Sequence, residues 1–397
     1  MIEFVILVLA LGLVLFYASR SGTRHLEGRF LLSAMMTAGW LTGLGLYAMP
    51  FTAVSGGIDI SAILAGVCGL FCARLLVRVA QAWAMSYQGW EQSNPDHPPR
   101  LVHPAIAVGL LLSGAPVLFG FAAARHETLE FQNTPRHPET GIVRGAEAIE
   151  IDADTTSDHA VLLIHGFLAS PSVFGTLPAD LTAAGLAVHA PLLPGHGTRP
   201  DDMKGRTHAD WVAAAQEAYD ALVADERFSK VSVVGFSFGG TLALRLDTTA
   251  HEPHRVVLAN PYLGTLFTPS WSPFETDDLL PVVAKLTARV MRPDSFVRLN
   301  KREALSQLAT YRTLPLESLV QLQELGQEVS AMEDPVSSTT LLLLSKNDST
   351  VPAARAQSLP LTASASSQVY EKSDHLLFLD HDGPAAAQAV VGWIMQD

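Results

Sequence analysis

The chain has 397 residues, of which 48% are hydrophobic and 16% are charged, and its formal net charge is −13. This acidic balance argues against binding to nucleic acid or to anionic lipid headgroups through surface charge. The apolar residues are concentrated before residue 125. The chain through Arg125 has seven arginines and five acidic residues, whereas 19 basic and 34 acidic residues follow.

Four segments of the first 125 residues have the length and apolar character of membrane-spanning helices. They are Ile2–Ser19, Phe30–Met49, Ala53–Ala73 and Pro104–Ala124. Each is close to the roughly 20 residues that a helix needs to cross a hydrocarbon core. Asp59 and the pair Gly56-Gly57 shorten the apolar part of the third segment. We therefore predict an all-α transmembrane region of about four helices over residues 1–125. The number of helices depends on whether the third segment crosses the membrane.

Arginines in two connecting loops predict how these helices are oriented. The two groups are Arg20, Arg24 and Arg29, and Arg74, Arg78 and Arg100. Loops rich in Lys and Arg face the cytoplasm. Both termini would then lie outside, and we expect a multi-pass protein of the bacterial inner membrane with an extracytoplasmic C-terminal domain. The cysteines, Cys68 and Cys72, fall in the third segment one helical turn apart, which favours membrane packing over redox chemistry.

A linker is expected at 126–158, because the segment contains several prolines, glycines and acids and ends in a short strand near 148–151. After it, strands and helices alternate. We expect strands at 161–164, 186–191, 231–235, 255–260 and 339–345, and helices at 173–184, 208–224, 238–248 and near 384–395. This alternation predicts a doubly wound, mostly parallel α/β domain over residues 159–397.

The alternation is interrupted between residues 261 and 335. Apolar residues there recur with helical spacing, at Leu279, Leu280, Val283, Leu286 and Val290. We predict a mostly helical cap over the active site. Trp271 and Phe274 fit two interpretations equally, as the lining of an acyl pocket or as the core of the cap.

A Gly-Phe-Ser-Phe-Gly motif occupies residues 235–239, directly after the run Val231-Ser232-Val233-Val234. A serine between a strand and a helix in this motif lies on a sharp turn that exposes its hydroxyl. The positions two before and two after the serine must lack bulky side chains, and Gly235 and Gly239 meet this need. Ser237 is therefore the candidate nucleophile.

A serine nucleophile needs a base, and the base needs a carboxylate that fixes its tautomer. Asp348 lies on the loop after the apolar run 339–344, and His375 follows 27 residues later, after a short strand-like stretch at 368–370. Three other acids compete for the same role, at Asp334, Asp374 and Asp380. Asp334 precedes the strand, Asp374 adjoins the histidine and Asp380 follows it, so we expect Asp348 to be the acid.

With these motifs, residues 159–397 resemble the α/β-hydrolase superfamily, and most of all bacterial carboxylesterases, monoacylglycerol lipases and serine aminopeptidase-like hydrolases. The further motifs that carry the resemblance are His165-Gly166-Phe167, Pro194-Gly195-His196-Gly197, Val351-Pro352 and Ser373-Asp374-His375.

The resemblance implies an α/β-hydrolase fold with a Ser237, Asp348 and His375 triad. It also implies an oxyanion hole made by the backbone N–H groups of Phe167 and Phe238. His196 then shapes a loop and is not a second base.

The expected function is that of a membrane-anchored serine hydrolase. Its substrate would be a small-molecule or lipid carboxylic ester with a lipid-like or medium-chain acyl group, with monoacylglycerol as one candidate. An acyltransferase, a thioesterase or peptidase using the same triad, and an inactive membrane-bound binding module remain alternatives. We expect no cofactor, no metal and no nucleic acid partner, and the sequence leaves the oligomeric state open.

Overall fold

The computed structural model describes residues 134–396 except 153–156, 247–251, 265–277, 333–338 and the positions 279, 282, 283, 285–287, 293, 295, 296 and 363. The chain divides into Met1–His126 and Glu127–Asp397, and every described residue belongs to the second unit. The predicted membrane helices, both cysteines, Trp271 and Phe274 lie outside the described residues. Within the described ranges, no helix has both the length and the apolar character to span a membrane.

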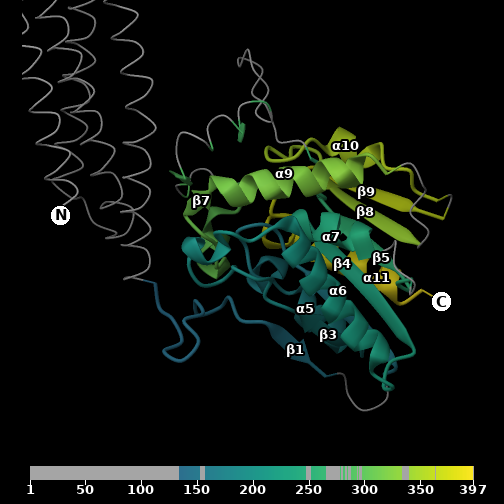
Figure 1. Ribbon diagram of the computed structural model, residues 1–397. Coiled ribbons are helices and arrows are strands. Elements are labelled where there is room, and N and C mark those ends of the chain that lie inside the picture. The colour runs from purple at the N-terminus through teal and green to yellow at the C-terminus, as the bar shows by residue number, and fades with distance from the viewer. Residues whose placement is uncertain are drawn as a thin grey trace, which may run out of the picture. The chain divides into compact units, whose positions relative to one another are not determined.

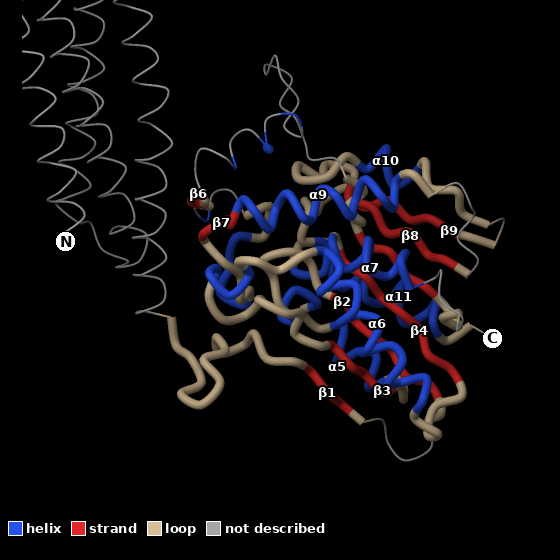
Figure 2. The backbone as a smooth tube through the Cα atoms, in the orientation of Figure 1, coloured by secondary structure: helices blue, strands red, loops and turns tan. Residues whose placement is uncertain are grey.

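A sheet of seven strands forms the centre of the domain (Figures 1 and 2). In chain order the strands are β1 Ile149–Ile151, β2 His159–Ile164, β3 Ala187–Ala190, β4 Lys230–Phe236, β5 Val256–Ala259, β8 Thr340–Ser345 and β9 Ser366–Tyr370. Their order across the sheet is β1-β3-β2-β4-β5-β8-β9. The β1–β3 pair is antiparallel, and every other neighbouring pair is parallel. This confirms the mostly parallel α/β sheet.

Burial on both faces explains why the strand sequences are continuous apolar runs. Every residue of β2 is buried. Val161 and Leu163 belong to the hydrophobic cluster on one face, whereas Leu162 and Ile164 belong to the cluster on the other. The period of two along a strand produces this division.

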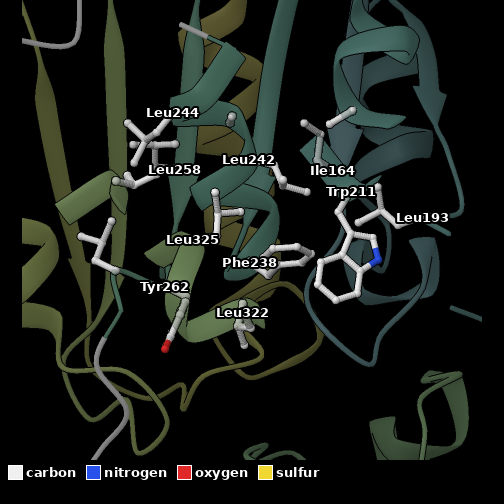
Figure 3. Close-up of a cluster of buried hydrophobic side chains, with 14 of the residues drawn as sticks. Ile164, Leu193, Trp211, Phe238, Leu242, Leu244, Leu258, Tyr262, Leu322 and Leu325 are labelled. Carbon is white, nitrogen blue, oxygen red and sulfur yellow. The ribbon is translucent and has the colours of Figure 1, made fainter. Parts of the chain in front are cut away.

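Helices cover both faces of the sheet. The helices α5 Leu177–Ala183 and α11 Gly383–Ile394 contribute buried side chains to one cluster, and α6 His208–Ala224, α7 Phe238–Leu246 and α9 Leu316–Ser330 contribute to the other. Figure 3 shows the second cluster, with Trp211, Phe238, Leu242 and Leu325 among its members. The other helices whose bounds the structure describes are short: α10 Ala353–Gln357 and the 3₁₀ turns Pro171–Phe174, Pro200–Met203, Arg302–Gln307 and Leu377–Leu379.

Local chemistry accounts for where two of the helices begin. The carboxylate of Asp210 accepts a hydrogen bond from the backbone N–H of Thr207 at 2.7 Å, which caps α6 at its N-terminus. The predicted helix over 173–184 is divided in the structure into a 3₁₀ turn and α5. Gly175, with φ of 55°, breaks the helical backbone between them.

The insertion between β5 and β8 differs from the predicted cap. Its described part contains β6 Arg289–Met291 and β7 Thr313–Pro315, which pair with each other in antiparallel fashion. Its last helix, α9, packs against α6 and α7 and so belongs to the helical layer on the sheet. The prediction of one mostly helical cap over 261–335 therefore extends too far, because α9 buries its apolar face against the sheet's own helices.

The end of the predicted linker is docked on the domain. The N–H of Val143 donates to the carbonyl of Gly197 at 2.8 Å, and Ala146 is fully buried. The guanidinium of Arg136 donates to the carbonyl of Gly141 at 3.1 Å and to that of Thr198. Residues 136–146 are thus held against the loop 195–198 before β1 begins.

Candidate active site

Ser237 lies in a strained turn between β4 and α7. Its φ is 53°, a left-handed conformation that is unfavourable for a residue with a side chain. A Cβ atom on Gly239 would lie 1.8 Å from the carbonyl oxygen of Ile164, and one on Gly235 would lie 2.3 Å from that of Gly239. The two glycines of the motif therefore permit a close approach of backbone segments that no other residue type would allow.

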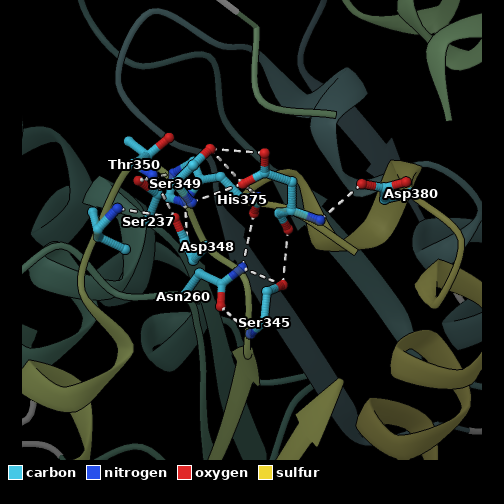
Figure 4. A network of polar contacts seen from close by, with 10 residues as sticks. Ser237, Asn260, Ser345, Asp348, Ser349, Thr350, His375 and Asp380 are labelled. Carbon is cyan, nitrogen blue, oxygen red and sulfur yellow. Dashed lines mark hydrogen bonds and ion pairs between the residues drawn. The ribbon is translucent and has the colours of Figure 1, made fainter. Parts of the chain in front are cut away.

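Ser237, His375 and Asp348 form a chain of hydrogen bonds (Figure 4). The Nδ1 atom of His375 lies 2.7 Å from Oδ2 of Asp348, and its Nε2 lies 2.9 Å from Oγ of Ser237. An ionised carboxylate can only accept hydrogen bonds, so Nδ1 carries a proton and donates a hydrogen bond to Asp348. Nε2 is then free to accept the hydroxyl proton of Ser237, as a general base must.

Backbone groups fix the orientation of the Asp348 carboxylate. Its Oδ1 accepts hydrogen bonds from the N–H groups of Thr350 at 2.8 Å and Val351 at 2.9 Å. The side chain is 1% exposed. With Oδ1 held in this way, Oδ2 is directed at His375.

Two of the competing acids have other partners. Oδ1 of Asp374 accepts from the N–H groups of Ser349 and His375, both at 2.8 Å. Asp374 thus joins the loop that carries Asp348 to the loop that carries His375.

Asp380 is 1% exposed and binds backbone alone. Four N–H groups donate to its two oxygens at 2.8–2.9 Å, those of Asn300, Lys301, Asp374 and His381. The remaining candidate, Asp334, lies outside the described residues.

Sequence reasoning missed Asn260, which joins three parts of the site. Its Nδ2 donates to the carbonyl of His375 at 2.8 Å and to Oγ of Ser345 at 3.0 Å, and its Oδ1 accepts from the N–H of Ser345 at 2.7 Å. Figure 4 shows this amide beneath the histidine loop. A positive φ of 43°, which asparagine tolerates better than most residues, places the side chain there. No local pattern signals such a role.

The turn 165–167 after β2 lies directly beside the serine. A Cβ atom on Gly166 would be 3.3 Å from that of Ser237. No backbone acceptor among the described residues bonds to the N–H of Phe167 or of Phe238. The Phe167 and Phe238 rings meet edge to face, with centroids 6.0 Å apart.

The nearby histidines are held neutral. The N–H of Leu193 donates to Nε2 of His165 at 3.0 Å, so Nδ1 of His165 is protonated and faces the carbonyl of Gly166. Burial lowers the pKa of His165 to about 3 and that of His196 to about 4. Nδ1 of His196 lies 3.1 Å from the carbonyl of Pro194. These contacts fit a loop-shaping role for both imidazoles.

The described residues contain no group of three or more His, Cys, Asp or Glu side chains arranged to hold a metal ion. The polar side chains of Ser237, His375 and Asp348 form a hydrogen-bonded series. Such an arrangement is suited to attack on a carbonyl carbon.

Residues 161–389 match the alpha/beta hydrolase family, which is more than half of the chain. The chain belongs to this family. The matched range begins in β2 and ends within α11, so it includes the serine turn and both loops that carry the acid and the histidine.

Two relatives are similar over more than half of the chain. The thermostable monoacylglycerol lipase of Bacillus sp. (strain H-257) is 31% identical over 230 residues, which cover 56% of this chain and 85% of the relative. The carboxylesterase of Bacillus subtilis (strain 168) is 23% identical over 236 residues, covering 59% and 91%.

Among solved structures, one of two metagenome-derived lipolytic enzymes superimposes with a TM-score of 0.54 at 24% identity. The match covers 64% of this chain and 98% of that one. At this identity the likeness supports the fold of the hydrolase.

Proposed function

We propose that this hydrolase cleaves carboxylic esters through an acyl-enzyme formed on Ser237. The hydrogen-bonded series of Asp348, His375 and Ser237 carries the proposal. His375 takes the hydroxyl proton as Ser237 attacks the ester carbonyl, and it returns that proton to the leaving alcohol. Water then attacks the acyl-enzyme, again with His375 as base, and releases the carboxylic acid together with the free serine.

The N–H groups of Phe167 and Phe238 are proposed to stabilise the tetrahedral intermediate. The ester oxygen becomes an oxyanion when Ser237 attacks, and preformed donors bind that charge more strongly than the neutral carbonyl. Each such donor is worth about 3 kcal/mol of transition-state stabilisation in measured cases. Asp348 stabilises the imidazolium that forms at the same time.

A lipid-like ester with a medium-chain acyl group, monoacylglycerol among the candidates, is the proposed substrate. The support is the similarity to a monoacylglycerol lipase, together with the half-buried Phe167 on the turn beside the serine. A series of p-nitrophenyl esters of increasing chain length, with monoacylglycerol alongside, tests this on the detergent-solubilised full chain. We expect a maximum at medium chain length.

Other products would identify the alternative chemistries. An acyltransferase would form a new ester when an alcohol is added, at the expense of the free acid. A thioesterase or peptidase would prefer thioester or amide substrates at equal acyl chain length. A binding module without activity would not react with a fluorophosphonate probe, which labels activated serines.

We further propose that residues 1–125 anchor the hydrolase in a bacterial inner membrane, with the active site outside the cytoplasm. The four apolar segments and the arginine-bearing loops support this. Alkaline phosphatase fused after Asp397 should be strongly active, because it requires export. A GFP fusion at the same position should be dark. A fluorescent GFP fusion with inactive phosphatase would place the domain in the cytoplasm, as expected if one of the four segments does not cross.

A further inference from the structure

The backbone next to Phe167 is strained and needs external support. Leu168 has a φ of 61°, a left-handed conformation that is unfavourable for a leucine. Leu168 follows Phe167 in the chain, so an anchored Leu168 limits how far the turn that carries the N–H of Phe167 can move. Any contact that holds Leu168 therefore also holds the proposed oxyanion donor.

Residues 309–311 of the insertion hold this strained backbone. The carbonyl of Leu168 accepts hydrogen bonds from the N–H of Tyr311 at 3.1 Å and from Oγ1 of Thr310 at 2.8 Å. Two serines of the same loop complete the contact. Oγ of Ser170 donates to the carbonyl of Ala309 at 3.0 Å, and the N–H of Ala309 donates to Oγ of Ser172 at 3.0 Å.

The Tyr311 side chain extends this support to a second loop. Its hydroxyl accepts from the N–H of Thr198 at 2.9 Å and donates to the carbonyl of Gly195 at 2.7 Å. The side chain is 4% exposed, and burial raises the pKa of the phenol, so the hydroxyl keeps the proton that it donates. The loop 195–198 is the one on which residues 136–146 are docked.

We propose that Tyr311 is a positioning residue for the oxyanion hole. Its backbone N–H anchors the carbonyl of Leu168, at the end of the turn that carries the N–H of Phe167, and its hydroxyl fixes the 195–198 loop against residues 309–311. This rests on the proposed function, because Phe167 is an oxyanion donor only if Ser237 is the nucleophile. Because residues 136–146 are docked on the 195–198 loop, they too support the active site in this proposal.

The test is Tyr311→Phe in the full chain, which keeps the buried ring and removes the two hydroxyl contacts. The oxyanion exists only after attack has begun, so a displaced donor lowers kcat and leaves KM nearly unchanged. We expect kcat to fall about tenfold, corresponding to one displaced hydrogen bond. Labelling by a fluorophosphonate should slow in parallel, since its adduct also places an oxygen in the hole.

Tyr370→Phe is the matched control, because it removes a hydroxyl bonded to Gln368 on the exposed strand β9. It should leave kcat unchanged. Thr310→Val removes a direct contact with Leu168 and should reproduce the kcat loss. The pH profile of kcat/KM should keep its shape in Tyr311→Phe and Thr310→Val, because His375 and Asp348 are unchanged in both.

An unchanged kcat in folded Tyr311→Phe and Thr310→Val proteins would overturn the proposal, as would a loss confined to KM or a displaced pH profile. A wild-type chain that neither hydrolyses esters nor reacts with the probe would instead refute the proposed function itself.

Discussion

Replacing Ser237 by alanine is expected to abolish ester hydrolysis. The alanine keeps the Cβ atom and the strained backbone of the turn, and it removes the oxygen that lies 2.9 Å from Nε2 of His375. Loss of a triad nucleophile lowers kcat by a factor on the order of 10³ or more, with residual rate from the oxyanion hole and substrate binding. The measurement is kcat on the best ester of the chain-length series, with the melting temperature recorded for the same sample.

Ser358→Ala is the control for this prediction. Ser358 is exposed, and its hydroxyl caps the end of α10 by donating to the carbonyl of Arg355 at 2.7 Å. The control variant should retain full activity. A Ser237→Ala protein that keeps most of the wild-type rate would show that another group is the nucleophile.

Strands buried on both faces could be predicted to within one or two residues. The runs expected at 161–164, 231–235 and 339–345 appear as His159–Ile164, Lys230–Phe236 and Thr340–Ser345. Their apolar character follows from burial alone and is visible in one stretch of sequence. The helix expected at 208–224 has the same bounds in the structure, where Thr207 and Asp210 form its cap.

The insertion was harder to predict because its structure depends on contacts between residues that are distant in the sequence. β6 and β7 have three residues each, too few for a period of two to be recognised, and they pair across 21 intervening residues. α9 has an apolar spacing of its own, at Leu316, Leu319, Leu322 and Leu325, and packs on the sheet's own helices. The spacing of apolar residues indicates that one face of a helix is buried, but it does not indicate which element packs against that face.

The polar support of the site is invisible in the sequence for a similar reason. The triad could be proposed because each member follows a recognisable strand. Asn260, in contrast, acts through Ser345, 85 positions away, and Tyr311 acts through Thr198, 113 positions away. Neither residue type is unusual in its own segment. Such contacts become evident when the fold brings the loops together.

Asp348→Asn is expected to lower kcat by a factor on the order of 10³–10⁴ in a protein that still folds. The N–H groups of Thr350 and Val351 face Oδ1 and will select the amide oxygen at that position. The amide NH₂ then points at Nδ1 of His375, from which the carboxylate of Asp348 accepts a hydrogen bond in the wild-type protein. His375 must adopt the tautomer protonated at Nε2, which cannot take the proton of Ser237.

The same substitution at the two neighbouring acids separates this effect from general damage. In Asp374→Asn the amide oxygen can keep both N–H contacts of Oδ1, and the NH₂ can donate to Oγ of Ser349 in place of Oδ2. We therefore expect most of kcat to remain. In Asp380→Asn an NH₂ group meets two buried N–H donors, which should cost about 2 kcal/mol of folding stability while the folded fraction keeps its kcat. The opposite result would contradict our choice of acid. Asp348→Asn would then be nearly as active as wild type, and Asp374→Asn or Asp380→Asn would show the large loss of kcat. The triad acid would be that other residue, and the described fold would be unaffected.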